Sequence, residues 1–289
     1  MPHTTLVTTD QLEARLADPG WAVFDCRHDL AKPDHGRAEY ARGHIPGAHF
    51  LHLDDDLSGS PARTPGETGG RHPLPEPGAF AARLAALGVD KDTQVIAYDA
   101  QGAMVASRLW WMLRWLGHAA VAVLDGGWNK WVAEGRPQST GAQQASSKIR
   151  AGRLQPATDA GRVDAGYVLA HLRQPDMRLV DARAPDRFRG ENETLDPVGG
   201  RIPGAVNRYF RDNLEANGQF KMAAQLREEF GRILGDTSPG AVVHQCGSGV
   251  SACHNILAME IAGLSGSSLY PGSWSEWCAD PSRPVERGA

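Results

Sequence analysis

Short runs of β-branched residues alternate along the chain with longer segments in which apolar residues recur every three or four positions. The strand-like runs lie at residues 95–96, 121–124 and 242–243. The helical spacing covers residues 80–87, 106–116, 226–234 and 255–262. Strands and helices that alternate in this way predict an α/β fold, in which a central, mainly parallel sheet is flanked by helices on both faces.

The apolar segment at residues 109–115 reads Leu-Trp-Trp-Met-Leu-Arg-Trp. Such a segment is typical of a buried helix, which we favour over a cofactor site or a membrane patch. No apolar run approaches the ~18 residues that a membrane-spanning helix needs. We therefore expect no membrane partner.

Four landmarks of the first half of the sequence recur in the second half in the same order. The matched segments are residues 23–27 and 179–183, 45–48 and 202–205, 95–99 and 242–246, and 124–131 and 269–277. The offset between matched landmarks stays between 145 and 157 residues. Chance does not preserve order and spacing at four places, so we expect two copies of one domain.

A stretch of small and polar residues without periodicity separates the two copies and has the character of a linker. We expect an N-terminal domain at residues 1–138, a linker at residues 139–157 and a C-terminal domain at residues 158–289. A chain of 289 residues is long enough for each domain to bury its own core.

The composition restricts the class of protein. Hydrophobic residues make up 41% and charged residues 22%, as in a soluble globular protein, and the net charge of −4 argues against nucleic acid as a partner. The N-terminus has no basic segment followed by an apolar one, so we expect no export. Four cysteines in so long a chain do not form a disulfide scaffold. We expect reduced thiols in the cytoplasm.

The strongest candidate for chemistry is the segment that begins at Cys246, where an apolar strand runs into Cys-Gly-Ser-Gly-Val-Ser and a helical pattern follows. Ligands of open α/β sheets bind at the carboxyl ends of strands. Gly247 and Gly249 allow the backbone N–H groups of the loop, through Val250 and Ser251, to converge on one point. Together with the helix dipole, these groups favour the thiolate of Cys246 and any anion built on it, including a persulfide.

Two other interpretations of Cys246 are weaker. An inert core cysteine would not need a glycine on each side of Ser248. A zinc site built from residues 244, 246, 253 and 254 would lack a Cys-x-x-Cys pair, so we expect no metal. Nothing in the sequence implies a cofactor.

Three features together resemble the family of tandem-domain rhodaneses and 3-mercaptopyruvate sulfurtransferases. They are the Arg-Gly-His-Ile-Pro-Gly-Ala segment at residues 42–48, the glycine-rich cysteine loop and the closing Trp-x-x-Trp at residues 274–277. The resemblance implies two similar α/β domains, of which only the C-terminal one is catalytic, and a site in the cleft between them. Asp99 stands where Cys246 stands in the second half, so the first copy cannot carry sulfur.

The resemblance also implies a relay of a loop serine, a histidine and an aspartate beside the cysteine. Those positions match Ser248, His72 and Asp54. Such a relay can polarise a carbonyl and move a proton as pyruvate enolate departs. The neutral residues after Cys246 favour 3-mercaptopyruvate as the donor over thiosulfate, for which relatives carry basic residues there.

The substrate arginine of the family matches Arg187, which can clamp a carboxylate or a sulfonate. A second arginine usual in mercaptopyruvate enzymes is missing from residues 193–197. Arg201 or Arg189 could replace it, which leaves thiosulfate open as an alternative donor. The acceptor is expected to be cyanide or a thiol such as thioredoxin.

Two hypotheses from other classes are weaker. Phosphatases with this fold carry a Cys-x5-Arg loop, whereas the sixth residue after Cys246 is Ala252. A non-catalytic binding module would have lost the cysteine, as the first copy has at Asp99.

Overall fold

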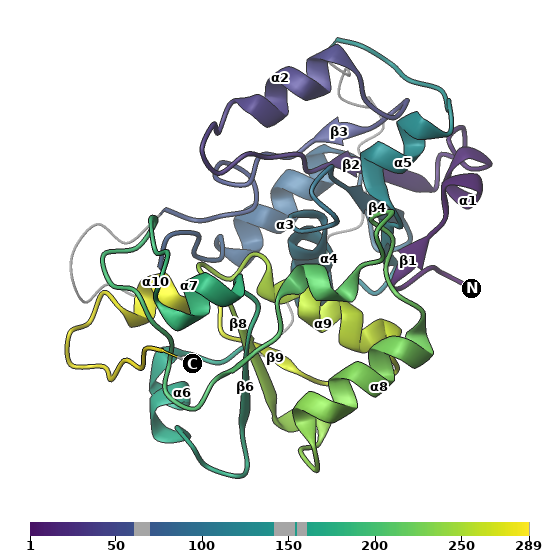
Figure 1. Ribbon diagram of the computed structural model, residues 1–289. Coiled ribbons are helices and arrows are strands. Elements are labelled where there is room, and N and C mark those ends of the chain that lie inside the picture. The colour runs from purple at the N-terminus through teal and green to yellow at the C-terminus, as the bar shows by residue number, and fades with distance from the viewer. Residues whose placement is uncertain (61–69, 142–153, 155–160, 289) are drawn as a thin grey trace. The chain divides into compact units, whose positions relative to one another are not determined.

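The computed structural model describes residues 1–60, 70–141, 154 and 161–288, which form two compact units (Figure 1). The first unit comprises the described residues of Met1–Gly59, Pro75–Thr158 and Leu214–Phe220. The second unit comprises those of Ser60–Leu74, Asp159–Asn213 and Lys221–Ala289. Each unit therefore includes a short segment from the other half of the sequence. Most of the predicted linker, residues 142–153 and 155–157, lies outside the described residues, and the predicted domain boundaries stay predictions.

The first unit is built on a five-stranded sheet in the order β1-β5-β4-β2-β3, with every neighbouring pair parallel. Its strands are β1 (Leu6–Val7), β2 (Trp21–Asp25), β3 (His49–Phe50), β4 (Gln94–Tyr98) and β5 (Val121–Leu124). Its helices are α1 (Thr9–Glu13), α2 (His35–Arg42), α3 (Pro77–Ala86), α4 (Ala106–Trp115) and α5 (Gly127–Ala133).

The second unit repeats this plan with a four-stranded parallel sheet in the order β7-β6-β8-β9. Its strands are β6 (Arg178–Asp181), β7 (Val206–Asn207), β8 (Val242–Gln245) and β9 (Ser268–Leu269). Its α-helices are α6 (Ala165–Ala170), α7 (Pro185–Arg189), α8 (Ala223–Leu234), α9 (Ala252–Ile261) and α10 (Ser273–Trp277), and its 3₁₀ helices are η1 (Phe210–Asn213) and η2 (Pro239–Ala241). The predicted α/β class, with parallel sheets flanked by helices, is confirmed.

The four predicted helices correspond to α3, α4, α8 and α9, with bounds that differ by a few residues. Helix α4, which holds the tryptophan-rich segment, is buried along nearly its whole length and packs on β4 and β5. The buried-helix interpretation of that segment is therefore correct. In the part of the chain that the structure describes, no helix combines the length and the apolar character needed to cross a membrane.

The acid and base that recur at the strand ends form a buried ion pair in each unit. Arg27 contacts Asp25 at 2.6 Å in the first unit, and Arg183 contacts Asp181 at 2.7 Å in the second. Each guanidinium also lies over a tryptophan ring of its own unit. The repeated acid–base pair therefore has a structural role: it holds the end of the strand and the residues that follow it in place.

Candidate active site

Cys246 directly follows β8, at the carboxyl end of the strand, and is 2% exposed. The loop that follows ends where α9 begins at Ala252. Gly249 has φ +75°, and a side chain there would clash with the carbonyl oxygen of Pro271. Only glycine fits this position without strain, so the tight loop is a direct consequence of the sequence.

The first residues of α10 hold the cysteine loop through three hydrogen bonds. The backbone N–H of Cys246 donates to Ser273 Oγ at 3.1 Å. The N–H groups of Trp274 and Ser275 donate to the carbonyl oxygens of Cys246 and Gly247 at 3.0 and 2.9 Å. These bonds fix the backbone on both sides of the thiol.

Ser273 is a site residue that the sequence reasoning missed. It is fully buried and has φ +53°, a left-handed conformation that is costly for serine. In the repeat, the equivalent residue of the first unit is Gly127, with φ +55°. The signal in the sequence was a serine where the first copy of the repeat has Gly127. A serine that tolerates such a strained position indicates that its hydroxyl makes compensating hydrogen bonds.

The first unit shows what a loop of this kind does to an anion. Its Asp99, at the position of Cys246, accepts four hydrogen bonds of 2.8–2.9 Å from the backbone N–H groups of Gln101, Ala103, Val105 and Ala106. Burial raises the pKa of Asp99, against the opposing effect of these four bonds. The carboxylate occupies the place that a sulfur anion on Cys246 would take in the second unit.

Two predicted relay residues lie together in the second unit. His72 Nδ1 is 2.6 Å from Ser248 Oγ, although 176 residues separate them in the sequence, and both side chains are buried. The segment that carries His72 is anchored by the backbone N–H of Arg71, which donates to Ser275 Oγ at 3.0 Å. The same α10 segment thus positions both the cysteine loop and the histidine.

The third predicted relay residue, Asp54, belongs to the first unit, so its place in the relay stays a prediction.

Asp54 lies beside His52 and His28, and the three side chains form the one group among the described residues that could hold a metal ion. The ring nitrogens of His52 already have partners. Its Nε2 lies 3.0 Å from Pro33 O, and its Nδ1 accepts the N–H of Asp54 at 3.2 Å. No lone pair of His52 remains for a metal.

Two arginines converge on the cysteine loop. The Nη1 and Nη2 atoms of Arg187 lie 3.6 and 3.7 Å from the point that a Cβ on Gly247 would occupy, and Nη2 of Arg71 lies 3.3 Å from it. Arg187, the predicted donor-binding arginine, thus lies beside the cysteine loop, and its role in donor binding stays a prediction. Arg71, in contrast, was not predicted.

A third cation, Arg183, is buried near the thiol. Burial disfavours its charged form, but the carboxylates of Asp181 and Glu193 and the charge of Cys246 outweigh this effect and raise its pKa. Arg183 therefore adds a buried positive charge close to the cysteine loop.

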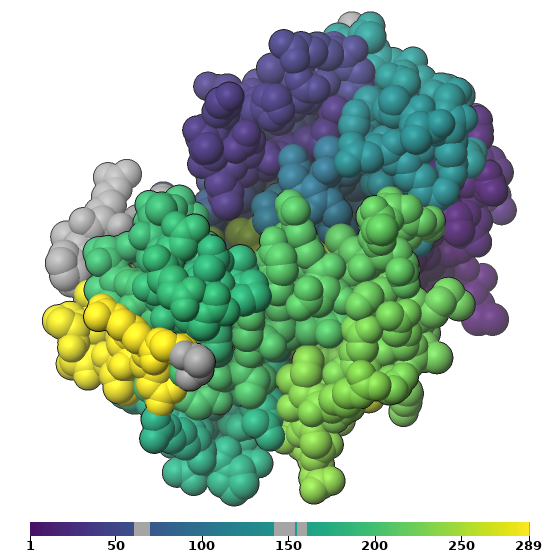
Figure 2. Space-filling view, in the orientation of Figure 1, coloured from purple at the N-terminus to yellow at the C-terminus, as the bar shows by residue number. Residues whose placement is uncertain are grey.

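Arg201, the predicted substitute for the missing arginine, contacts the C-terminal segment. Its backbone forms an antiparallel bridge with Glu286, and its guanidinium donates to Gly288 O and lies over the ring of Phe188. Figure 2 shows the C-terminal segment, in yellow, against the green surface of this unit. A role of Arg201 in donor binding stays a prediction.

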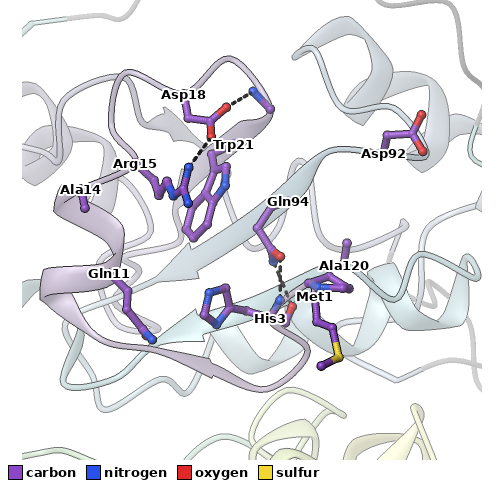
Figure 3. A pocket seen from close by; sticks show the side chains of 12 residues that line it. Met1, His3, Gln11, Ala14, Arg15, Asp18, Trp21, Asp92, Gln94 and Ala120 are labelled. Carbon is purple, nitrogen blue, oxygen red and sulfur yellow. Dashed lines mark hydrogen bonds and ion pairs between the residues drawn. The ribbon is translucent and has the colours of Figure 1, made fainter.

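Each unit has a sizeable cavity lined by described residues. The cavity of the first unit, about 590 Å³, is lined by Trp21, Gln94 and Ala120, at or next to the amino ends of β2, β4 and β5, and by His3, which bonds to Gln94 at 2.8 Å (Figure 3). Because ligands of parallel sheets bind at the carboxyl ends of strands, this cavity is not the candidate site.

The cavity of the second unit, about 560 Å³, lies next to the segments that build the site. Its lining includes Pro73 and Leu74, which follow His72, and Pro271 and Gly272, which precede α10. The cavity therefore adjoins His72 and the amino end of α10, which holds the cysteine loop.

Comparison with known proteins finds relatives along the whole chain. A model of the rhodanese-like domain matches residues 8–134 and 164–280. The chain is 46% identical to the probable 3-mercaptopyruvate sulfurtransferase of Pseudomonas aeruginosa, over 100% of both chains. It is 37% identical to the putative thiosulfate sulfurtransferase SseB of Mycobacterium tuberculosis, over 98% of this chain and 97% of that one. The crystal structure of SseA from Escherichia coli, described among 3-mercaptopyruvate sulfotransferases, matches with a TM-score of 0.78 at 30% identity, over 94% of this chain and 100% of that one.

Proposed function

Because this chain belongs to the family of proteins built from the rhodanese-like domain, we propose that it is a sulfurtransferase that moves sulfur from 3-mercaptopyruvate to a thiophilic acceptor through a persulfide on Cys246. The observation that carries the proposal is the 2.6 Å contact between His72 and Ser248, two residues after the thiol. A donor whose leaving group is an enolate needs a proton carrier, and this pair is one.

The first half-reaction begins with attack of the Cys246 thiolate on the sulfur atom of the donor. An S–S bond forms while the C–S bond breaks, and its electron pair leaves with pyruvate as an enolate. The hydroxyl of Ser248 polarises the carbonyl oxygen. The proton of the outer persulfide sulfur passes through Ser248 and His72 to the enolate carbon, which yields pyruvate and a persulfide anion.

The cysteine loop stabilises the persulfide anion. Its backbone N–H groups take the role that the equivalent groups play toward Asp99 in the first unit. In the second half-reaction, cyanide or a thiolate attacks the outer sulfur, the S–S bond breaks, and the Cys246 thiolate is regenerated. A dithiol such as thioredoxin fits the acceptor role, because its second thiol can release the transferred sulfur.

Thiosulfate is the second candidate donor. The two guanidiniums near Gly247 favour it, because a sulfonate can accept hydrogen bonds from both. Measured kcat/KM values for both donors with one acceptor decide between them, and we expect the larger value for 3-mercaptopyruvate. A larger value for thiosulfate would assign the enzyme to that donor.

Replacement of the nucleophile tests the persulfide. Cys246→Ser should abolish transfer from every donor, because serine forms no persulfide. Cys253→Ser and Cys278→Ser, which change other buried thiols, should retain most of the activity. Mass spectrometry of the wild-type protein after donor treatment should find one added sulfur on the peptide that holds Cys246. Turnover by Cys246→Ser contradicts the assignment.

A further inference from the structure

We infer that Arg71 is the second guanidinium that binds the carboxylate of the donor, in place of the arginine that residues 193–197 lack. The inference rests on the proposed function. Its starting point is the placement of Arg71 Nη2 3.3 Å, and of Arg187 Nη1 3.6 Å, from the Cβ position of Gly247. Two guanidiniums from distant parts of the sequence thus meet above the residue that follows the nucleophile.

Buried carboxylates hold both guanidiniums from one side. Arg71 Nη1 donates to Asp196 Oδ1 at 2.6 Å. Arg187 donates to Glu193 from Nε at 3.1 Å and from Nη2 at 2.7 Å. The side chains of Asp196 and Glu193 are 4% and 3% exposed, which makes them fixed supports. The atoms that face Gly247, Nη2 of Arg71 and Nη1 of Arg187, do not take part in these bonds.

The two guanidiniums and two carboxylates carry no net charge together. Long-range attraction of an anion is therefore weak, and binding depends on directed N–H donors at short range. A planar carboxylate suits two such donors, because it accepts hydrogen bonds on both oxygens. We expect the affinity for the donor to depend on guanidinium geometry more than on charge alone.

The order of residues along the chain matches the order of groups along the donor. Arg71 is followed by His72, which contacts Ser248. In 3-mercaptopyruvate the carboxylate is bonded directly to the carbonyl carbon. A carboxylate on Arg71 and Arg187 would thus place the carbonyl at the Ser248–His72 pair, with the sulfur-bearing carbon beyond it toward Cys246.

Gly247 is part of the same arrangement. A Cβ at this position would come within 3.3 Å of Arg71, closer than ordinary van der Waals contact. An alanine would force the guanidinium of Arg71 back by a few tenths of an ångström, whereas Arg187 would remain at ordinary contact distance. Glycine here therefore leaves room for the guanidiniums beside the loop.

The test compares two alkylating reagents of similar size, anionic iodoacetate and neutral iodoacetamide. The rate at which each modifies Cys246 is followed by mass spectrometry of its peptide. In Arg71→Ala the ratio of the iodoacetate rate to the iodoacetamide rate should fall about 10-fold, because a charge-assisted hydrogen bond to the carboxylate is lost. Arg71→Lys should lie between this variant and the wild type.

Two further variants make the test specific. Arg71→Ala/Asp196→Asn also removes the charge of Asp196, which in the single variant would keep only its ion pair with Arg187 at 3.5 Å, and the ratio should fall as in the single variant. Arg232→Ala, which removes an exposed arginine paired with Glu228 on α8, should leave the ratio unchanged. In steady state, Arg71→Ala should raise KM for 3-mercaptopyruvate about 10- to 100-fold and change kcat far less, whereas a merely structural role would lower kcat as well.

An unchanged ratio in folded Arg71 variants overturns the inference, as does a fall that appears only in Arg201→Ala. The outcome is independent of sulfur transfer. A wild-type protein that moves no sulfur but shows an Arg71-dependent ratio refutes the proposed function and leaves the anion site intact. Sulfur transfer with a ratio that does not depend on Arg71 supports the proposed function and refutes the anion site.

Discussion

Because His72 contacts Ser248, replacement of either residue should affect turnover of the two donors differently. Mercaptopyruvate leaves as an enolate that must be polarised and protonated, whereas thiosulfate leaves as sulfite, already a stable anion. Ser248→Ala and His72→Ala should therefore lower kcat for 3-mercaptopyruvate by roughly 10²–10⁴-fold, the usual contribution of a general acid–base group. Thiosulfate turnover should change far less. Equal losses for both donors contradict the relay and leave thiosulfate as the favoured substrate.

Ser273 combines a strained backbone with two hydrogen bonds of its hydroxyl. Its Oγ accepts the N–H of Cys246 at 3.1 Å and donates to the carbonyl oxygen of Tyr270 at 2.9 Å. Ser273→Ala keeps the strain and loses both bonds, so the free energy of unfolding should fall by about 1–3 kcal/mol.

Ser273→Gly is the matched variant, because it relieves the strain while it loses the same bonds. Its stability in urea should stay close to that of the wild type. Its rate of persulfide formation should nevertheless fall, since the N–H of Cys246 loses its acceptor. If both variants are as stable and as active as the wild type, the hydroxyl has no such role.

Among the elements of the fold, the loop after β4 is stabilised by the carboxylate that it surrounds. Asp99→Asn leaves one oxygen to accept and turns an NH₂ group toward backbone donors. The free energy of unfolding should therefore fall by about 2–3 kcal/mol, as expected for lost hydrogen bonds to a charged group. Urea denaturation measures the change.

Asp99→Ala gives the comparison for this loop, because it removes the carboxylate without placing an NH₂ group next to the backbone N–H donors. It should be destabilised as well, since four buried N–H groups lose their acceptor. If Asp99→Asn and Asp99→Ala both unfold at the urea concentration of the wild type, the bonds to Asp99 contribute nothing to stability.

Each unit includes a short segment from the other half of the sequence, so neither half contains all the residues of its own unit. The second unit needs residues 70–74, which supply Arg71 and His72. In the first unit, the Asp125 carboxylate accepts hydrogen bonds of 2.9 Å from the Gln219 side chain and from the N–H of Phe220. Fragments cut at residue 138 therefore each lack a segment of their unit.

Residues 139–289 expressed alone should be inactive with 3-mercaptopyruvate, although they contain Cys246. A full-length protein with a protease site inserted near residue 138, and cut after folding, should retain activity because both exchanged segments stay in place. Sulfur transfer by the isolated fragment at the full-length rate would show that His72 and Arg71 are dispensable.

The amino-acid sequence by itself determined the fold class and the duplication, and it predicted Cys246 as the nucleophile. These inferences depend on apolar periodicity, on the turn that Gly249 allows, and on landmarks that recur in the same order at offsets of 145–157 residues. Arg187 was predicted from the family resemblance, and its role stays a prediction. Apolar periodicity and the glycine turn lie within short stretches, where backbone geometry follows directly from residue type. The duplication is visible when the two halves are compared, without knowledge of how they fold.

Only the tertiary structure decided which distant side chains meet. Arg71 and Asp196 are 125 residues apart, and Arg71 lies in a segment without periodicity that joins the other half's unit. No local pattern predicts where such a segment binds, because its position depends on contacts with α10 that form only when the chain is folded. The unpredicted contact of Arg71 with Asp196 follows from that docking. The contact of His72 with Ser248 follows from it too, and the sequence led us to expect it only through the family resemblance.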